Sequence, residues 1–209
     1  MIRAVLFDCD GVLADSEGVA NHVVAAAVTA LGWPMDAEMA QREFLGMALP
    51  DMEPRITARV GPLPKGWSQE LGRQIETDLA SVRPMAGAEA ALRAVAAAGL
   101  PMALCSNSSR GELAVKLRVL GFAAYFEGRV FSFEDVENPK PAPDIYLAAA
   151  RACGFPPGEC LVVEDSATGL AAGAAAGCRL ASVVEGMGVP HLVLAHIGDH
   201  LGPIEDPKT

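Results

Sequence analysis

Short, continuously apolar runs of strand length recur along the chain, and this pattern constrains the fold more than any other feature. Helical patterns that end at a glycine lie between most of these runs. Continuously apolar strands are buried on both faces, which is typical of a parallel sheet covered by helices on both sides. The expected strands are residues 4–7, 102–105, 130–131, 161–163 and 181–184.

The helical patterns between the later strands share one type of ending. They finish at Gly99, Gly121, Gly154 and Gly177, and glycine is favoured there because it adopts the left-handed conformation common after a helix C-terminus. The expected helices are residues 88–98, 112–120, 144–153 and 168–176. Alternating strands and helices of this kind predict an α/β fold, a doubly wound parallel sheet with a Rossmann-like core.

One region departs from this alternation. Residues 17–82 contain no clear strand but several helical stretches, at residues 21–31, 36–44, 50–60 and 68–81. Helices inserted between the first and second strands predict a separate α-helical cap subdomain. We therefore expect a core of residues 1–15 and 83–209, a cap of residues 16–82, and hinges near residues 14–16 and 81–84.

Composition limits the classes of partner. The 209 residues are 51% hydrophobic, and 16 Lys and Arg against 26 Asp and Glu give a net charge of −10, which argues against nucleic acid or an anionic membrane as the main partner. No apolar run approaches the roughly 20 residues of a membrane span, and no targeting segment is recognisable. Five cysteines without a CxxC pair indicate dispersed thiols in a reducing compartment. We expect a cytoplasmic monomer.

Polar residues follow the predicted strands at the edge where parallel strands end. In open α/β sheets, functional residues collect at this carboxyl edge. Each group has a simpler interpretation when taken alone, such as a surface acidic pair or a helix N-cap. Their order, one group at each strand end, favours an active site. The residues are Asp8, Asp10, Ser106, Asn107, Ser108, Lys140, Glu164, Asp165 and Ser166.

The segments FDCDGVLADSE, CSNSS, KPAPD and VVEDSATG resemble, in order and spacing, the four motifs of the haloacid dehalogenase superfamily. The resemblance spans the chain to about residue 186, and the helical insertion looks like the small cap of the phosphatase and phosphoglucomutase branch. It implies an aspartyl-phosphate mechanism in which Asp8 is the nucleophile and Asp10 is the general acid and then the general base. Ser106 and Lys140 would bind the phosphoryl group.

The resemblance also implies a metal cofactor. A carboxylate can attack an anionic phosphate ester only if a cation screens the repulsion, and Mg²⁺ prefers hard oxygen ligands. The implied ligands are the Asp8 carboxylate, the Asp10 backbone carbonyl and Asp165, with Glu164 either a direct ligand or a residue behind one. Further substrate contacts are expected from Asn107 and, on the cap, from Gly46 and Met47.

Three functions stay open at this point. The first is a Mg²⁺-dependent phosphatase that hydrolyses a small phosphorylated metabolite, with sugar and sugar-acid phosphates as the expected class. The second is a hexose phosphate mutase of the beta-phosphoglucomutase type. The resembling mutases place a cap histidine where this chain has Ala20 and a cap arginine where residues 47–50 contain none. The third is a non-enzymatic phospho-receiver module, which the late acidic pair and the hydrolytic Asp10 disfavour.

Other polar and sulfur-containing residues have weaker claims on function. Arg42 and Arg55 of the cap either meet a second anionic group of the substrate or are solvated helix charges. Cys9 and Cys105 adjoin site residues, but strand alternation turns them toward the core. Three C-terminal histidines suggest a metal site only weakly, because nothing in the pattern supplies a partner. They are His191, His196 and His200.

Overall fold

The computed structural model describes residues 1–201, and for Glu17 and His200 it describes the backbone alone. Its centre is a five-stranded sheet in the order β5-β4-β1-β6-β7, and every pairing in it is parallel. This architecture confirms the predicted α/β fold. The strands are β1 (Ala4–Phe7), β4 (Met102–Cys105), β5 (Val130–Phe131), β6 (Cys160–Glu164) and β7 (Arg179–Ser182).

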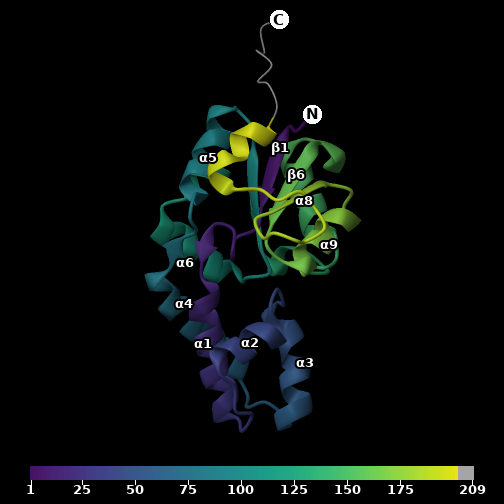
Figure 1. Cartoon of the computed structure of the whole chain (residues 1–209). Coiled ribbons are helices and arrows are strands. Elements are labelled where there is room, and N and C mark those ends of the chain that lie inside the picture. The colour runs from purple at the N-terminus through teal and green to yellow at the C-terminus, as the bar shows by residue number, and fades with distance from the viewer. Residues whose placement is uncertain (202–209) are drawn as a thin grey trace, which may run out of the picture.

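Helices cover both faces of the sheet (Figure 1). One face is covered by α5 (Ala88–Ala97), α6 (Arg110–Leu120) and the C-terminal 3-10 segment η4 (Leu194–His200), and the other by α8 (Asp144–Cys153) and α9 (Ala167–Ala175). A short helix, α7 (Ala123–Phe126), was not predicted.

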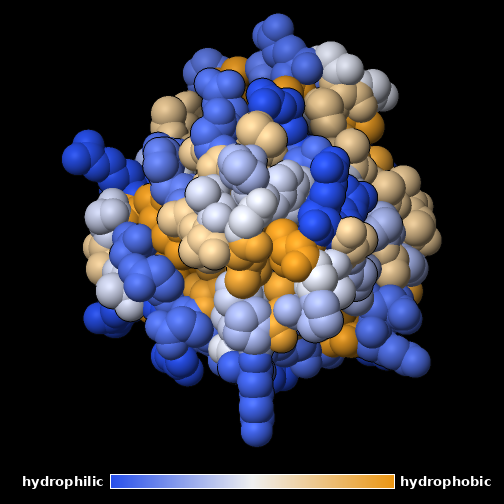
Figure 2. Space-filling view, turned by 90° about the horizontal axis from the view of Figure 1, so that it is seen from below, coloured by the Kyte–Doolittle hydropathy of each residue, from blue (hydrophilic) through white to orange (hydrophobic). Residues whose placement is uncertain are grey.

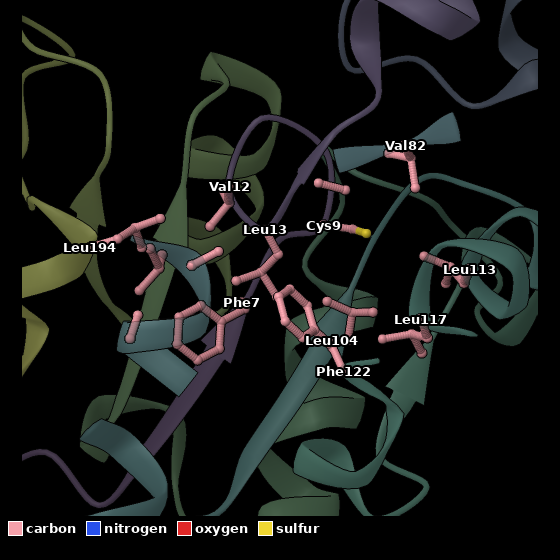
Figure 3. Packing of buried hydrophobic residues seen from close by; sticks show 14 of the residues in the cluster. Phe7, Cys9, Val12, Leu13, Val82, Leu104, Leu113, Leu117, Phe122 and Leu194 are labelled. Carbon is pink, nitrogen blue, oxygen red and sulfur yellow. The ribbon is translucent and has the colours of Figure 1, made fainter. Parts of the chain in front are cut away.

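The side chains of β1 alternate between two apolar clusters, one on each face of the sheet. Val5 and Phe7 belong to the larger cluster, and Ala4 and Leu6 to the smaller one. Figure 3 shows the larger cluster around Phe7, with side chains from β4 and α6 packed beside it. Burial on both faces is what the continuously apolar runs predict.

Most predicted bounds are confirmed to within two residues, and the differences have local causes. Strand β7 begins at Arg179 and ends at Ser182, each two residues earlier than predicted. It ends there because Ser182 also pairs with His191 and the chain then turns away. Helix α6 begins at Arg110 because the Ser109 hydroxyl accepts a hydrogen bond from the Glu112 backbone and caps it there.

The chain between β1 and β4, the first two strands of the five-stranded sheet along the sequence, is mainly helical, as predicted. It forms the lower part of Figure 1. The stretch predicted as a single helix at 68–81 consists of α4 and a 3-10 turn. Apolar side chains of this region join the larger cluster of the sheet. The elements are α1 (Glu17–Ala30), α2 (Ala37–Phe44), α3 (Leu49–Val60), α4 (Trp67–Asp78) and η1 (Leu79–Ser81).

The chain passes between the sheet and the helical region at two points, where we expected hinges. There β2 (Ala14–Asp15) and β3 (Arg83–Pro84) form a two-residue antiparallel ladder. Neither strand was predicted, since two residues are too short to show a period. The ladder places the two crossings side by side.

The surface seen from the side of the helical region is mixed. Figure 2 shows apolar side chains near the middle of this face and hydrophilic ones around its edge. Within residues 1–201, no helix has both the length and the apolar character that a membrane span requires.

Candidate active site

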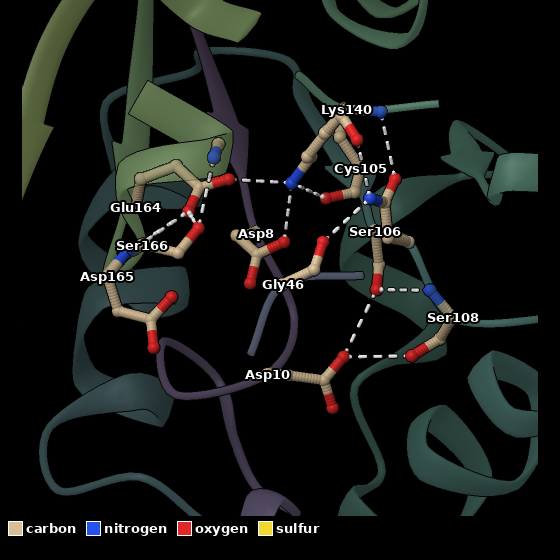
Figure 4. Close-up of polar contacts among 12 residues, drawn as sticks. Asp8, Asp10, Gly46, Cys105, Ser106, Ser108, Lys140, Glu164, Asp165 and Ser166 are labelled. Atoms are coloured by element: carbon tan, nitrogen blue, oxygen red, sulfur yellow. Dashed lines mark hydrogen bonds and ion pairs between the residues drawn. The ribbon is translucent and has the colours of Figure 1, made fainter. Parts of the chain in front are cut away.

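The structure brings the predicted strand-end residues together at the carboxyl edge of the sheet (Figure 4). Asp8 follows β1, Glu164 ends β6 and Ser106 follows β4, while Lys140 lies on the loop before α8. A pocket of about 140 Å³ opens beside them, between this edge and the helical region. The parallel order of the sheet is what makes side chains so distant in sequence into neighbours.

Lys140 is the centre of one half of the site. Its Nζ donates to Asp8 Oδ1 at 2.6 Å, to Glu164 Oε1 at 2.6 Å and to the Cys105 carbonyl at 2.8 Å. Burial would lower the pKa of Lys140, but the Asp8 and Glu164 carboxylates outweigh it and raise the pKa. The ammonium group therefore stays charged, with its three protons directed at three fixed acceptors.

Three carboxylates form a cluster next to Lys140. One oxygen each from Asp8, Glu164 and Asp165 lies within 4.8 Å of the others, and no second group of this kind occurs among the described residues. Burial, and then the neighbouring Glu164 charge, raises the pKa of Asp8. Clustered carboxylates with one lysine between them have excess negative charge, so this donor set fits a hard divalent cation.

Glu164 is fully buried, and both of its oxygens have protein partners. Oε1 accepts from Lys140 and from the Tyr146 hydroxyl at 2.6 Å, and Oε2 accepts from the Ser166 hydroxyl at 3.0 Å. Gly169 makes room for this side chain, because a Cβ atom there would lie 1.7 Å from Glu164 Oε1. Glu164 thus fixes the position of Lys140.

Asp10 forms a second polar centre, on the other side of the pocket. Its Oδ1 accepts from the Lys116 ammonium at 2.5 Å and from the Ser16 hydroxyl, and its Oδ2 accepts from Ser106 at 3.1 Å and Ser108 at 2.9 Å. Burial would raise the pKa of Asp10, but the charge and hydrogen bond of Lys116, with the serine hydrogen bonds, lower it to about 2.

Several members of these two centres were missed from the sequence. Lys116 could have been found, because it follows Leu113 by three residues and so lies on the helix face predicted to be buried. Tyr146 had a weaker signal, since a buried tyrosine needs a partner for its hydroxyl. Ser16 has the residue type and place of a helix N-cap. It precedes α1, but its backbone is helical rather than extended, and its hydroxyl donates to Asp10 instead of capping.

Comparison with known proteins places this arrangement in a family. The sequence model of the family described as haloacid dehalogenase-like hydrolase matches residues 2–177. The chain belongs to this family. It is a hydrolase, and its strand-end residues occupy the segments through which the resemblance was recognised.

Individual proteins similar to this chain support its membership of the haloacid dehalogenase-like family. The chain is 29% identical to the 6-phosphogluconate phosphatase of Escherichia coli over 86% of its own length and 81% of that protein. A family hydrolase from Deinococcus radiodurans, solved with phosphate and sodium, is 35% identical, with a TM-score of 0.67, and the match covers 96% of this chain and 88% of that one. CbbY from Rhodobacter sphaeroides, solved with phosphate, is 25% identical, with a TM-score of 0.83, and the match covers 95% and 97%.

Asn107 of this hydrolase connects the helical side of the pocket with the loop that carries Lys140. Its Nδ2 donates to the Gly46 carbonyl at 2.9 Å and to the Lys140 carbonyl at 3.0 Å, and its Oδ1 accepts from the Lys140 backbone at 3.1 Å. The amide predicted to contact substrate therefore holds protein groups on both sides. Gly46 has a φ of +73°, and a Cβ atom there would lie 3.2 Å from Thr168, so a glycine suits this close approach.

The helical region lines the pocket mainly with apolar side chains. Met47, which is expected to contact substrate, is among them, and Asn21 adds a polar group. Among the described residues that line the pocket, the cations are Lys116 and Lys140, both from outside the helical region. The apolar lining residues of the helical region are Ala20, Val24, Phe44, Leu45, Met47, Leu49, Met52, Ile75 and Leu79.

The structure also places the residues with weaker claims on function. Arg42 pairs with Glu38 at 3.6 Å, and Arg55 donates to the Glu43 carbonyl at 3.1 Å. Neither arginine is among the described residues that line the pocket, so both act as helix-surface charges here.

The C-terminal histidines lie apart from the site. His191 faces Glu185 at 3.9 Å, and His196 is exposed, while the side chain of His200 lies outside the described residues. Cys9 and Cys105 are buried in the core, as predicted.

Proposed function

We propose that this hydrolase is a Mg²⁺-dependent phosphatase that hydrolyses a small sugar or sugar-acid phosphate through an aspartyl-phosphate on Asp8. One observation carries the proposal: the Asp8 carboxylate, at the end of the central strand, meets the Lys140 ammonium at 2.6 Å and lies beside two further carboxylates. A nucleophile, a cation for the phosphoryl group and a set of hard ligands thus converge on one point.

The reaction has two steps, both carried by residues of the site. In the first, Asp8 Oδ attacks phosphorus, the bond from phosphorus to the ester oxygen breaks, and Asp10 gives a proton to the departing alcohol from its protonated form, which the charge of the bound phosphate and the loss of the Ser106 hydrogen bond favour. In the second, Asp10 takes a proton from water, the water oxygen attacks the aspartyl-phosphate, and inorganic phosphate leaves while Asp8 is regenerated. Ser106 and Lys140 bind the phosphoryl oxygens in both steps.

Mg²⁺ would be held by the carboxylates of Asp8 and Asp165 and by the Asp10 backbone carbonyl. When bound, it screens the negative charge that Asp8 and the phosphate bring together. Glu164 already accepts hydrogen bonds at both oxygens. We therefore assign it to orienting Lys140 and the segment of Asp165 and Ser166.

The substrate class is supported by the relatives and by the pocket. The Escherichia coli relative is named for a sugar-acid phosphate, 6-phosphogluconate. Mutase chemistry needs a site for a second phosphate, and the helical side of the pocket supplies no cation among its described residues. Ala20, where the resembling mutases have a histidine, lines the same pocket. We therefore favour hydrolysis over transfer to a second sugar.

A panel of phosphorylated sugars and sugar acids, assayed for phosphate release with Mg²⁺, tests the proposal. β-Glucose 1-phosphate with a trace of the bisphosphate, followed by ³¹P NMR, separates the two chemistries. We expect inorganic phosphate and no accumulation of glucose 6-phosphate. Asp8→Asn protein purified in parallel measures contaminating phosphatase. Glucose 6-phosphate appearing ahead of inorganic phosphate would show a mutase, and silence on the whole panel would remove the phosphatase proposal.

A further inference from the structure

Lys116 is a buried cation that the proposed two-step reaction does not use. It comes from α6, its side chain is 3% exposed, and it lines the pocket. Its Nζ lies 2.5 Å from Asp10 Oδ1, 2.8 Å from the Ser108 hydroxyl and 3.9 Å from Glu112 Oε2. A buried lysine is costly unless its charge is paired, so its contacts point to its role.

The four donors to Asp10 differ in how permanent they are. In the proposed function, Ser106 turns to the phosphoryl group when substrate binds. Ser16 lies where the chain enters the helical region, so its position depends on how that region sits. Ser108 and Lys116 depend on neither, because both belong to the segment after β4, and α6 is anchored by the buried Leu113 and Leu117.

We propose that Lys116 is a positioning residue that holds the Asp10 carboxylate on the leaving-group side of the pocket through both steps. The proposal rests on the proposed function. Asp10 must reach the ester oxygen in the first step and a water on the same side in the second. Lys116 donates to Asp10 Oδ1 and to the Ser108 hydroxyl, and Ser108 in turn donates to Asp10 Oδ2, so both carboxylate oxygens are fixed.

Lys116 also balances charge on this side of the pocket. Asp10 and Glu112 both line it, and Lys116 is the cation between them. Without it, two carboxylates would face an incoming phosphate dianion. Its loss should therefore have two separable effects, a higher KM for any phosphate ester and an Asp10 carboxyl group that is no longer held within reach of the ester oxygen. The loss of orientation outweighs the rise in the pKa of Asp10 that removal of Lys116 also brings.

Leaving-group dependence distinguishes these effects. The value of kcat/KM covers the steps up to departure of the alcohol, and p-nitrophenolate departs without a proton, whereas a sugar alkoxide needs one. For Lys116→Met we expect kcat/KM to fall about 100-fold or more on the best sugar phosphate, in the range of general acid catalysis, and about tenfold or less on p-nitrophenyl phosphate. Arg118→Met, the loss of an exposed cation from the same helix, is the matched control and should change neither.

A second pair of variants covers the case in which Lys116→Met does not fold. In Asp10→Asn protein the carboxylate that Lys116 would position is already absent, so adding Lys116→Met removes the cation without leaving a charged Asp10 behind, and only Glu112 loses its partner. If Lys116 positions Asp10, the double variant should match Asp10→Asn within about twofold in kcat on p-nitrophenyl phosphate, and any further change should be confined to KM. Thermal unfolding of all variants reports on the fold.

The outcomes separate the two proposals. Equal losses on both substrates, or a further large loss in the double variant, would show that Lys116 acts on the phosphate or on the fold and would overturn the positioning role alone. Wild-type protein that hydrolyses neither substrate would overturn the proposed function, and the role of Lys116 with it.

Discussion

The pocket has two walls of opposite character. The core wall, formed by the strand-end loops and α6, presents the carboxylates of Asp8, Asp10, Glu112 and Asp165 with two lysines between them. The helical wall, formed by α1 to α4 and η1, presents mostly apolar side chains. On the core wall, Lys140 and Asp10 are held by several hydrogen bonds each, whereas the contact of the helical wall across the pocket is the hydrogen bond from Asn107 to the Gly46 carbonyl.

This difference separates chemistry from selection. Charges that develop in a transition state are stabilised best by groups that are already in place, and the core wall has such groups. Apolar side chains distinguish substrates by shape, with smaller energies for each contact. Changes in the core wall should therefore affect every phosphate ester, and changes in the helical wall should affect particular esters.

The largest expected effect comes from the nucleophile on the core wall. Asp8→Asn keeps the size of the side chain but removes the attacking charge, so we expect phosphate release to fall more than about a thousandfold on every ester. Phosphate release and thermal unfolding are measured on the same preparation. A folded variant that keeps a tenth of the wild-type rate would show that Asp8 is not the nucleophile.

Metal removal should come next in size and should also be independent of the ester. We expect EDTA to silence hydrolysis, Mg²⁺ to restore it and Ca²⁺ to fail, because Ca²⁺ takes more ligands in a looser geometry. Titration of the metal-free protein with Mg²⁺, followed by the rate on p-nitrophenyl phosphate, measures this. Full activity in EDTA would show that no metal takes part, and would leave Asp165 without a role in the reaction.

The two walls also differ in how far the sequence predicts them. The strands that carry Asp8, Ser106 and Glu164 could be predicted, because apolar runs and helix-ending glycines are local signals. The ion pair of Lys116 and Asp10 could not, since it joins residues 106 apart and depends on how α6 packs on the face of the sheet. The burial of Lys116 was nevertheless visible in the helical period, and its charge could have prompted a search for a partner.

For the helical wall, the sequence predicts helices but not the side chains that face the pocket. Met47 and Gly46 were identified only through the resemblance. Arg42 and Arg55, the cations nearest in sequence, pair within the helical region instead. Packing between helices decides which side chains turn inward, and periodicity within one helix does not specify it.

The contact between the walls offers a prediction of intermediate size. Asn107→Ala removes the bridge between the Gly46 and Lys140 carbonyls, so both the helical wall and the Lys140 loop lose a fixed point. We expect kcat/KM to fall about tenfold on a sugar phosphate. Gly46→Ala tests the same contact from the other side, because its positive φ and close approach to Thr168 disfavour a side chain. Wild-type kinetics in both variants would show that this contact does not matter for turnover.

The smallest effect on the chemistry, and the most selective one, is expected from the helical wall itself. Met52 of α3 lines the pocket, and Met52→Ala removes apolar surface without touching any charged group. We expect less than about threefold change in kcat on p-nitrophenyl phosphate, but up to about tenfold change in the ratio of kcat/KM between two sugar phosphates, since shape discrimination is worth about 1–3 kcal/mol. Met39→Ala, a half-buried methionine of α2 that does not line the pocket, is the control. Equal changes on all esters would mean that the helical wall supports the chemistry as a whole, and the division between the walls would then be wrong.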